Sequence, residues 1–76
     1  MRTERTEINT DFIKLDSLLK FAGLTETGGN AKAVIAEGRI KVNGEVCTQR
    51  GRKIFPGDKI EVPELELTLE ITARER

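Results

Sequence analysis

The chain has 76 residues, of which 13 are basic and 13 acidic, with one cysteine and no histidine, tryptophan or tyrosine. A chain of this length forms one small domain with a modest core, and the lack of histidine removes the usual general base and the common zinc sites. The single cysteine excludes an internal disulfide, and no apolar run is long enough to span a bilayer. We therefore expect a non-catalytic, cytoplasmic protein without membrane attachment, metal, cofactor or small-molecule substrate.

The net charge of zero conceals a segregation of charge along the chain. Residues 32–59 contain seven basic and three acidic side chains, a net charge of +4, which leaves −4 for the remainder. Charge that is segregated within one domain creates a local field that the total does not reveal. A surface that attracts polyanions is therefore expected on the part of the fold that these residues form.

The first 23 residues predict a polar end, a short strand and a helix. Residues 1–7 are polar and of mixed charge, which predicts a frayed end, and residues 7–13 alternate loosely, which predicts a short strand. Asp16 suits the first turn of a helix and Gly23 suits the position just after its end. The apolar stripe of this helix consists of Leu15, Leu18, Leu19 and Ala22.

A second helix is expected to follow after a few residues and to pack against the first. Thr27 is its predicted N-cap, and Gly28 and Gly29 open its first turn. Gly38 ends it, and its buried stripe consists of Ala31, Val34 and Ile35.

After the second helix the apolar spacing changes to alternation, which is typical of strands. Residues 40–42 lead into Asn43-Gly44, the strongest short signal of a hairpin with a type I′ turn. Pro56-Gly57 predicts another turn. Residues 58–62 alternate again, as do residues 65–71, whose outer face is acidic. Two short packed helices followed by a small antiparallel sheet give an α+β fold.

Three separate stretches offer groups that attract anions. The segment Gln49–Lys53 places a glycine between two arginines, whose forks match phosphate oxygens, and ends on a lysine. The helix start at Gly28-Gly29 exposes backbone amides, with Lys32 one turn further on. Arg39 and Lys41 alternate with apolar residues and so share the outer face of a strand. Alone, the basic segment and the strand charges fit a solvated surface better, and the two glycines fit a tight turn better, but together the three stretches predict one anion-binding surface.

Other conspicuous side chains receive structural interpretations. Cys47 is expected to be a small strand residue rather than a nucleophile, because no histidine can act as its base. Phe12, Phe21 and Phe55 are expected in the core, although the position of Phe55 beside the basic segment would also fit base stacking. The glutamates at 61, 64, 66 and 70 are expected to form a solvated face.

The order of these features resembles the S4-like RNA-binding domain. The resemblance runs over about residues 14–62 and rests on the segments 15–19, 23–24, 31–35, 38–44 and 56–60. Residues 27–32 and 50–53 are further similar to the small stand-alone bacterial members called YaaA and YbcJ. The resemblance implies one S4-like domain over residues 1–76, which we expect to be a monomer.

In that family the two helices and the following hairpin form one RNA-binding surface. The resemblance implies a non-catalytic RNA-binding protein whose partner is structured ribosomal RNA or an assembling ribosome. This chain has Thr27-Gly28 where the family usually has Ser-Arg, so we expect backbone amides to replace a missing side-chain contact. The implied RNA-binding residues are Lys14, Gly28, Gly29, Lys32, Arg39, Lys41, Arg50, Arg52 and Lys53.

Two other classes of protein fit part of the pattern. A basic surface would also suit a protein-interaction module that docks an acidic protein partner on the ribosome. A sulfur carrier of the β-grasp type shares Val42-Asn43-Gly44 and Pro56-Gly57-Asp58, but it needs a C-terminal Gly-Gly, and this chain ends in Ala-Arg-Glu-Arg. Partners that survive nuclease treatment would favour the protein-interaction module.

Overall fold

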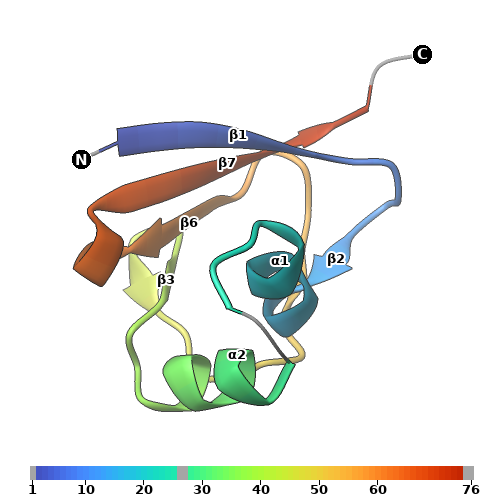
Figure 1. The fold of residues 1–76 in the computed structure, drawn as a ribbon. Coiled ribbons are helices and arrows are strands. Elements are labelled where there is room, and N and C mark those ends of the chain that lie inside the picture. Colours follow the sequence, from blue (N-terminus) through green and yellow to red (C-terminus); the bar gives the residue numbers. More distant parts are fainter. Residues whose placement is uncertain (1, 26–27, 75–76) are drawn as a thin grey trace.

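The structure is a layer of strands with helices packed on one face (Figure 1). The computed structural model describes residues 2–25 and 28–74. Its elements in chain order are β1 (Arg2–Ile8), β2 (Ile13–Lys14), α1 (Leu15–Phe21), α2 (Gly28–Ala36), β3 (Lys41–Val42), β4 (Glu45–Val46), β5 (Lys53–Ile54), β6 (Lys59–Val62), a 3-10 helix (Pro63–Leu65) and β7 (Leu67–Ala73). Within the described residues, the large sheet has the strand order β1-β7-β6-β3-β4, and β2 and β5 form a separate two-stranded ribbon.

Helix α1 has the stripe and the end that the sequence predicts. Leu15, Leu18 and Leu19 are completely or almost completely buried. Gly23 follows the helix with φ 76°, a left-handed conformation that glycine adopts without a steric penalty, and its N–H donates to the Lys20 carbonyl at 3.0 Å. The next residue, Leu24, packs against the core and so fixes the position of the chain just after the helix.

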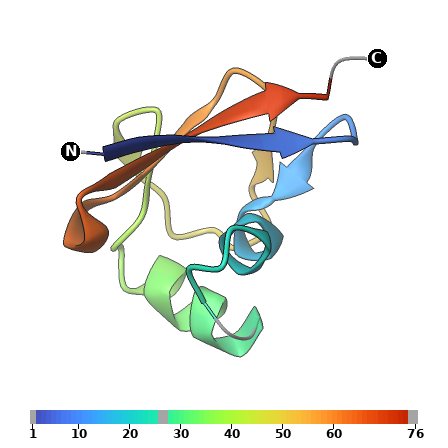
Figure 2. The same ribbon diagram turned by 45° about the horizontal axis from the view of Figure 1, so that its top comes forward.

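Helix α2 packs against α1 on the same side of the large sheet, as the second view confirms (Figure 2). Its buried positions are Ala31 and Ile35, with Val34 partly buried, and Gly38 ends it at φ 74°. These positions confirm the predicted stripe and stop. The predicted N-cap, Thr27, lies outside the described residues.

Both predicted turns are confirmed. Asn43 and Gly44 both have positive φ, 52° and 87°, as a type I′ turn requires between β3 and β4. In the second turn Gly57 has φ 99°, and the Asp58 N–H donates to the Phe55 carbonyl at 3.0 Å. Pro56 followed by a positive-φ glycine is the type II arrangement.

The N-terminal residues differ from the prediction of a frayed end. Residues 2–8 form β1, which pairs in parallel with β7 from Arg2 opposite Leu67 to Ile8 opposite Ala73. The large sheet is therefore mixed rather than antiparallel, and two strands precede the helices. The strand expected over residues 7–13 is also wrong in its bounds, because β1 ends at Ile8 and β2 begins only at Ile13. Most side chains of β1 are exposed, so the sequence lacked the apolar alternation that signals a strand.

The last strand begins later than its alternation suggests. Pro63 opens a 3-10 helix, and Leu65 within it is 51% exposed. Glu66 then turns the chain in a left-handed conformation, and β7 starts at Leu67. The alternation is confirmed from there on, since β7 buries Leu67, Leu69 and Ile71.

The core lies between the inner face of the large sheet and the two helices. No polar or charged side chain is buried among residues 2–25 and 28–74. Cys47, directly after β4, is 6% exposed and contributes to the core, which agrees with its predicted structural role. Phe21 and Phe55 are 64% and 48% exposed, so the prediction that they are core residues is wrong. Neither described helix is long and apolar enough to cross a membrane.

Candidate nucleic-acid interface

The ribbon of β2 and β5 brings two lysines side by side. Ile13 pairs with Ile54, and Lys14 pairs with Lys53, in antiparallel register. Successive residues of a strand point to opposite faces, and Ile54 is fully buried, so the lysines share the solvent face of the ribbon. Like charges directly opposite on paired strands destabilise a sheet, and an anion bound between them removes that repulsion.

The basic loop is anchored beside these lysines through its backbone. The carbonyl of Arg52 accepts from the Leu15 N–H at 2.9 Å, and that of Arg50 accepts from the Asp16 N–H at 3.1 Å. The Arg52 N–H in turn donates to the Gln49 carbonyl at 3.2 Å, which closes a tight turn. The loop therefore satisfies the first amides of α1 and is held next to Lys14, the residue that precedes this helix.

We call Lys14, Arg50, Arg52 and Lys53 the basic cluster. All four side chains are exposed, and none of them makes an ion pair within residues 2–25 and 28–74. Asp16 is the carboxylate next to them along α1, and it accepts a hydrogen bond from the Ser17 N–H at 2.7 Å. The cluster therefore presents four positive charges to solvent without a carboxylate partner of its own among the described residues.

The start of α2 adds the second predicted group. Gly28 and Gly29 open the helix, and Lys32 is exposed one turn further on. Because α2 packs against α1, both helices lie on the same side of the large sheet as the ribbon (Figure 1). A ligand that covers this side of the molecule can therefore reach both the cluster and α2.

Arg39 lies apart from the basic cluster, and carboxylates neutralise its positive charge. Its guanidinium donates to both carboxylate oxygens of Glu64 and, at 3.0 Å, to Glu37. These bonds, above all those to Glu64, raise the pKa of Arg39 above its ordinary value. The segment that leads from α2 into β3 lies at the opposite end of the molecule from β2 in both views (Figures 1 and 2).

Lys41 also lies apart from the cluster. Val42 on the same strand is buried against the core, so Lys41 points to the outer face of the large sheet, away from the helices. Its cross-strand neighbour on that face is Glu61, and Lys59 is likewise opposite Glu70. Opposite charges on paired strands attract each other. The basic residues of β3 and β6 therefore each have an acidic residue opposite them in the strand register, although no ion pair joins them among the described residues.

An aromatic pair beside the cluster was not predicted. The rings of Phe12 and Phe55 are tilted by 49° with centroids 5.9 Å apart, and the Lys53 Nζ lies 4.9 Å from the centroid of Phe12. These residues alternate with Ile13 and Ile54, so they belong to the solvent face of the ribbon. Only the pairing of β2 with β5 reveals this arrangement, and strands of two residues leave no alternation to detect.

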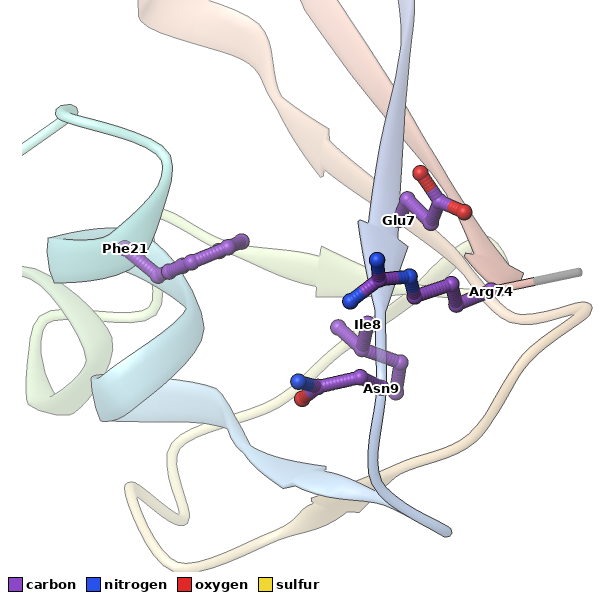
Figure 3. A pocket seen from close by; sticks show the side chains of 5 residues that line it. All are labelled: Glu7, Ile8, Asn9, Phe21 and Arg74. Atoms are coloured by element: carbon purple, nitrogen blue, oxygen red, sulfur yellow. The ribbon is translucent and has the colours of Figure 1, made fainter. Parts of the chain in front are cut away.

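A shallow hollow lies at the other end of α1 (Figure 3). Its lining comes from the end of β1, with Glu7, Ile8 and Asn9, and from Arg74 beside them. Phe21 lines the side that α1 forms. The Arg74 N–H donates to the Ile8 carbonyl at 2.9 Å and closes this end of the parallel strand pair. One acidic and one basic side chain give the lining no net charge, and the described residues contain no group of side chains suited to a metal ion.

These features define a small α+β domain in which, among the described residues, four exposed basic side chains gather where the ribbon meets the helices. The family model of the S4 domain matches residues 6–70 of the chain. Since the match covers most of the sequence, the chain belongs to the S4 domain family.

Two relatives support this membership. The chain is similar to the "Probable ribosome maturation protein RlbA" of Bacillus subtilis (strain 168), with 40% identity over 55 residues, 72% of this chain and 78% of the relative. It is also similar to the "Putative RNA-binding protein YbcJ" of Escherichia coli (strain K12), with 44% identity over 48 residues, 63% of this chain and 69% of the relative. Both matches span more than two thirds of the relative's own length.

Proposed function

We propose that this protein binds RNA through the basic cluster, without catalysing a reaction. The observation that carries the proposal is the placement of Lys14 opposite Lys53, with Arg50 and Arg52 anchored beside them. Four exposed cations gathered without carboxylate partners among the described residues are suited to a chain of phosphates. The names of the two relatives, "Probable ribosome maturation protein RlbA" and "Putative RNA-binding protein YbcJ", support the same proposal.

The arginines and the lysines of the basic cluster are suited to different contacts with phosphate. Arg50 and Arg52 offer planar forks that can hold two phosphate oxygens at once, while Lys14 and Lys53 act as point charges. Because the loop backbone is already hydrogen-bonded to α1, binding orders little more than the side chains. Affinity then comes mainly from phosphates, and selectivity from the shape of the folded RNA.

The start of α2 forms the second part of the proposed site. Lys32 is exposed there, and Gly28 and Gly29 carry amides at the positive end of the helix dipole. We assign these amides the phosphate contact for which the family usually uses an arginine side chain. We leave Arg39 and Lys41 outside the principal site, because Arg39 is ion-paired with Glu64 and Lys41 lies opposite Glu61 in the strand register, on the outer face of the sheet.

We further propose structured ribosomal RNA as the target and assembly of the ribosome as the setting, with the protein acting as a monomer. The name of the RlbA relative supports this choice. Crosslinking in cells, followed by sequencing of the bound RNA, tests it. The expected result is an enrichment of ribosomal RNA at a few sites. Recovery of no RNA, together with protein partners that survive nuclease treatment, would contradict the proposal and favour a protein-interaction module.

A further inference from the structure

The solvent face of the ribbon combines aromatic and cationic side chains. Phe12, Lys14, Lys53 and Phe55 occupy this face, since Ile13 and Ile54 point to the core. The Lys53 ammonium lies over the ring of Phe12, and the ring of Phe55 is tilted against the same ring. Phe55 is therefore the ring of the pair that is left 48% exposed, and it lies on the same face of the ribbon as Lys14 and Lys53.

The exposure of Phe55 is not explained by packing. The residue before it, Ile54, is fully buried, whereas Phe55 is 48% exposed. An aromatic ring left in water gives up much of the free energy that its burial would provide. An exposed ring next to uncompensated cations is the combination that proteins use for unpaired bases, since stacking holds the base and charge holds the backbone.

The backbone of Phe55 is held firmly. Its N–H donates to Asp58 Oδ2 at 2.8 Å, and its carbonyl accepts from the Asp58 N–H at 3.0 Å. The other carboxylate oxygen of Asp58 accepts from Asn43 Nδ2 at 3.1 Å. The ring is therefore presented from a fixed turn, so a ligand that stacks on it meets a preorganised surface.

We propose that an unpaired RNA nucleotide stacks its base on Phe55, while Lys14 and Lys53 hold the adjoining phosphates. This inference rests on the proposed RNA binding and specifies which part of the RNA the ribbon receives. A paired base inside a helix cannot offer its face, so the surface selects loops, bulges and strand ends. Any of the four bases can stack, so little sequence preference is expected.

Two RNA hairpins test the inference, one with a single bulged 2-aminopurine and one fully paired. The wild-type protein is expected to bind the bulged hairpin more tightly and to change the fluorescence of the 2-aminopurine. Phe55→Leu is expected to weaken binding of the bulged hairpin by about tenfold, the loss of one stacked base, and to leave the paired hairpin unaffected. Phe55→Tyr, which keeps an aromatic ring, is expected to retain both the affinity and the fluorescence change.

The matched control is Phe21→Leu, which removes a ring that is even more exposed than that of Phe55 and lies at the far end of α1. It is expected to bind both hairpins as the wild type does, and thermal unfolding checks that every variant folds. Equal binding of both hairpins by the wild type, or an unchanged affinity of Phe55→Leu for the bulge, would overturn the stacking inference alone. A wild-type protein that binds neither hairpin nor ribosomal RNA would overturn the proposed function as well.

Discussion

At the scale of single residues, Asn43 links two turns that are distant in the sequence. It adopts the left-handed φ of 52° that the type I′ turn demands. Its Oδ1 accepts from the Lys59 N–H at 2.9 Å, and its Nδ2 donates to Asp58. Since Asp58 also binds the Phe55 N–H, Asn43 supports the turn that presents the proposed stacking ring.

We predict that Asn43→Ala lowers the free energy of unfolding by about 2 kcal/mol, because alanine disfavours positive φ and cannot replace the hydrogen bonds. Asn43→Gly should lose less, since glycine tolerates the conformation. Gly51→Ala is the control and should be nearly neutral, because nothing lies within 4 Å of the added carbon and its φ is not positive. Urea denaturation measures all three. Equal stability of Asn43→Ala and the wild type would contradict the role assigned to this side chain.

Turn residues were predictable because their signal is local. Gly23, Gly38 and the Asn43-Gly44 pair each meet a requirement for positive φ that the neighbouring residues alone reveal. The partners of charged residues were not predictable in this way. The carboxylate that binds Arg39 through two hydrogen bonds comes from Glu64, 25 residues away, and the lysine opposite Lys14 is Lys53, so both pairings depend on the completed fold.

At the scale of elements, β1 is the strand that the sequence did not predict. It is an edge strand with mostly exposed side chains, and its parallel pairing with β7 joins the two ends of the chain. Ile8, at its end, is 5% exposed and belongs to the core. The ribbon was not predictable for a different reason: β2 and β5 have only two residues each, which is too short to show an alternating pattern.

We predict that Ile8→Ala destabilises the protein by about 2–5 kcal/mol, the usual range for truncating a buried isoleucine side chain to alanine. The neighbouring Glu7→Ala, which alters an exposed position of the same strand, should change stability by less than about 0.5 kcal/mol. Thermal and urea unfolding compare the two variants. If both were neutral, residues 1–7 would behave as the frayed end that composition suggested, and the pairing of β1 with β7 would contribute little.

At the scale of the whole molecule, the fold separates two kinds of charged surface. The outer face of the large sheet alternates in sign, with Lys41 opposite Glu61 and Lys59 opposite Glu70. The side that carries the ribbon and the helices holds the uncompensated basic cluster. The segregation of charge was visible in the sequence, but the placement of Lys14 opposite Lys53 and of Lys41 opposite Glu61 follows only from the strand register of the folded protein.

We predict that affinity for purified bacterial ribosomal RNA falls steeply with salt. About four phosphate contacts to unpaired RNA give a slope near −3 in a plot of log affinity against log salt concentration, because bound counterions are released. Filter binding over a range of potassium chloride concentrations measures the slope. A flat response would show that the cationic side chains do not hold phosphates.

The most direct test of the central claim, that the basic cluster is the RNA-binding site, compares two variants of equal charge. Arg52→Gln with Lys53→Gln removes two charges from the cluster, and Lys41→Gln with Lys59→Gln removes two from the opposite side of the molecule. The affinity for purified bacterial ribosomal RNA is measured at one salt concentration, for variants whose thermal unfolding matches that of the wild type. It is expected to fall about tenfold or more for the first variant and to stay within about twofold of wild type for the second. Equal losses in the two variants, or no loss in the first, would contradict the assignment of the site to the cluster.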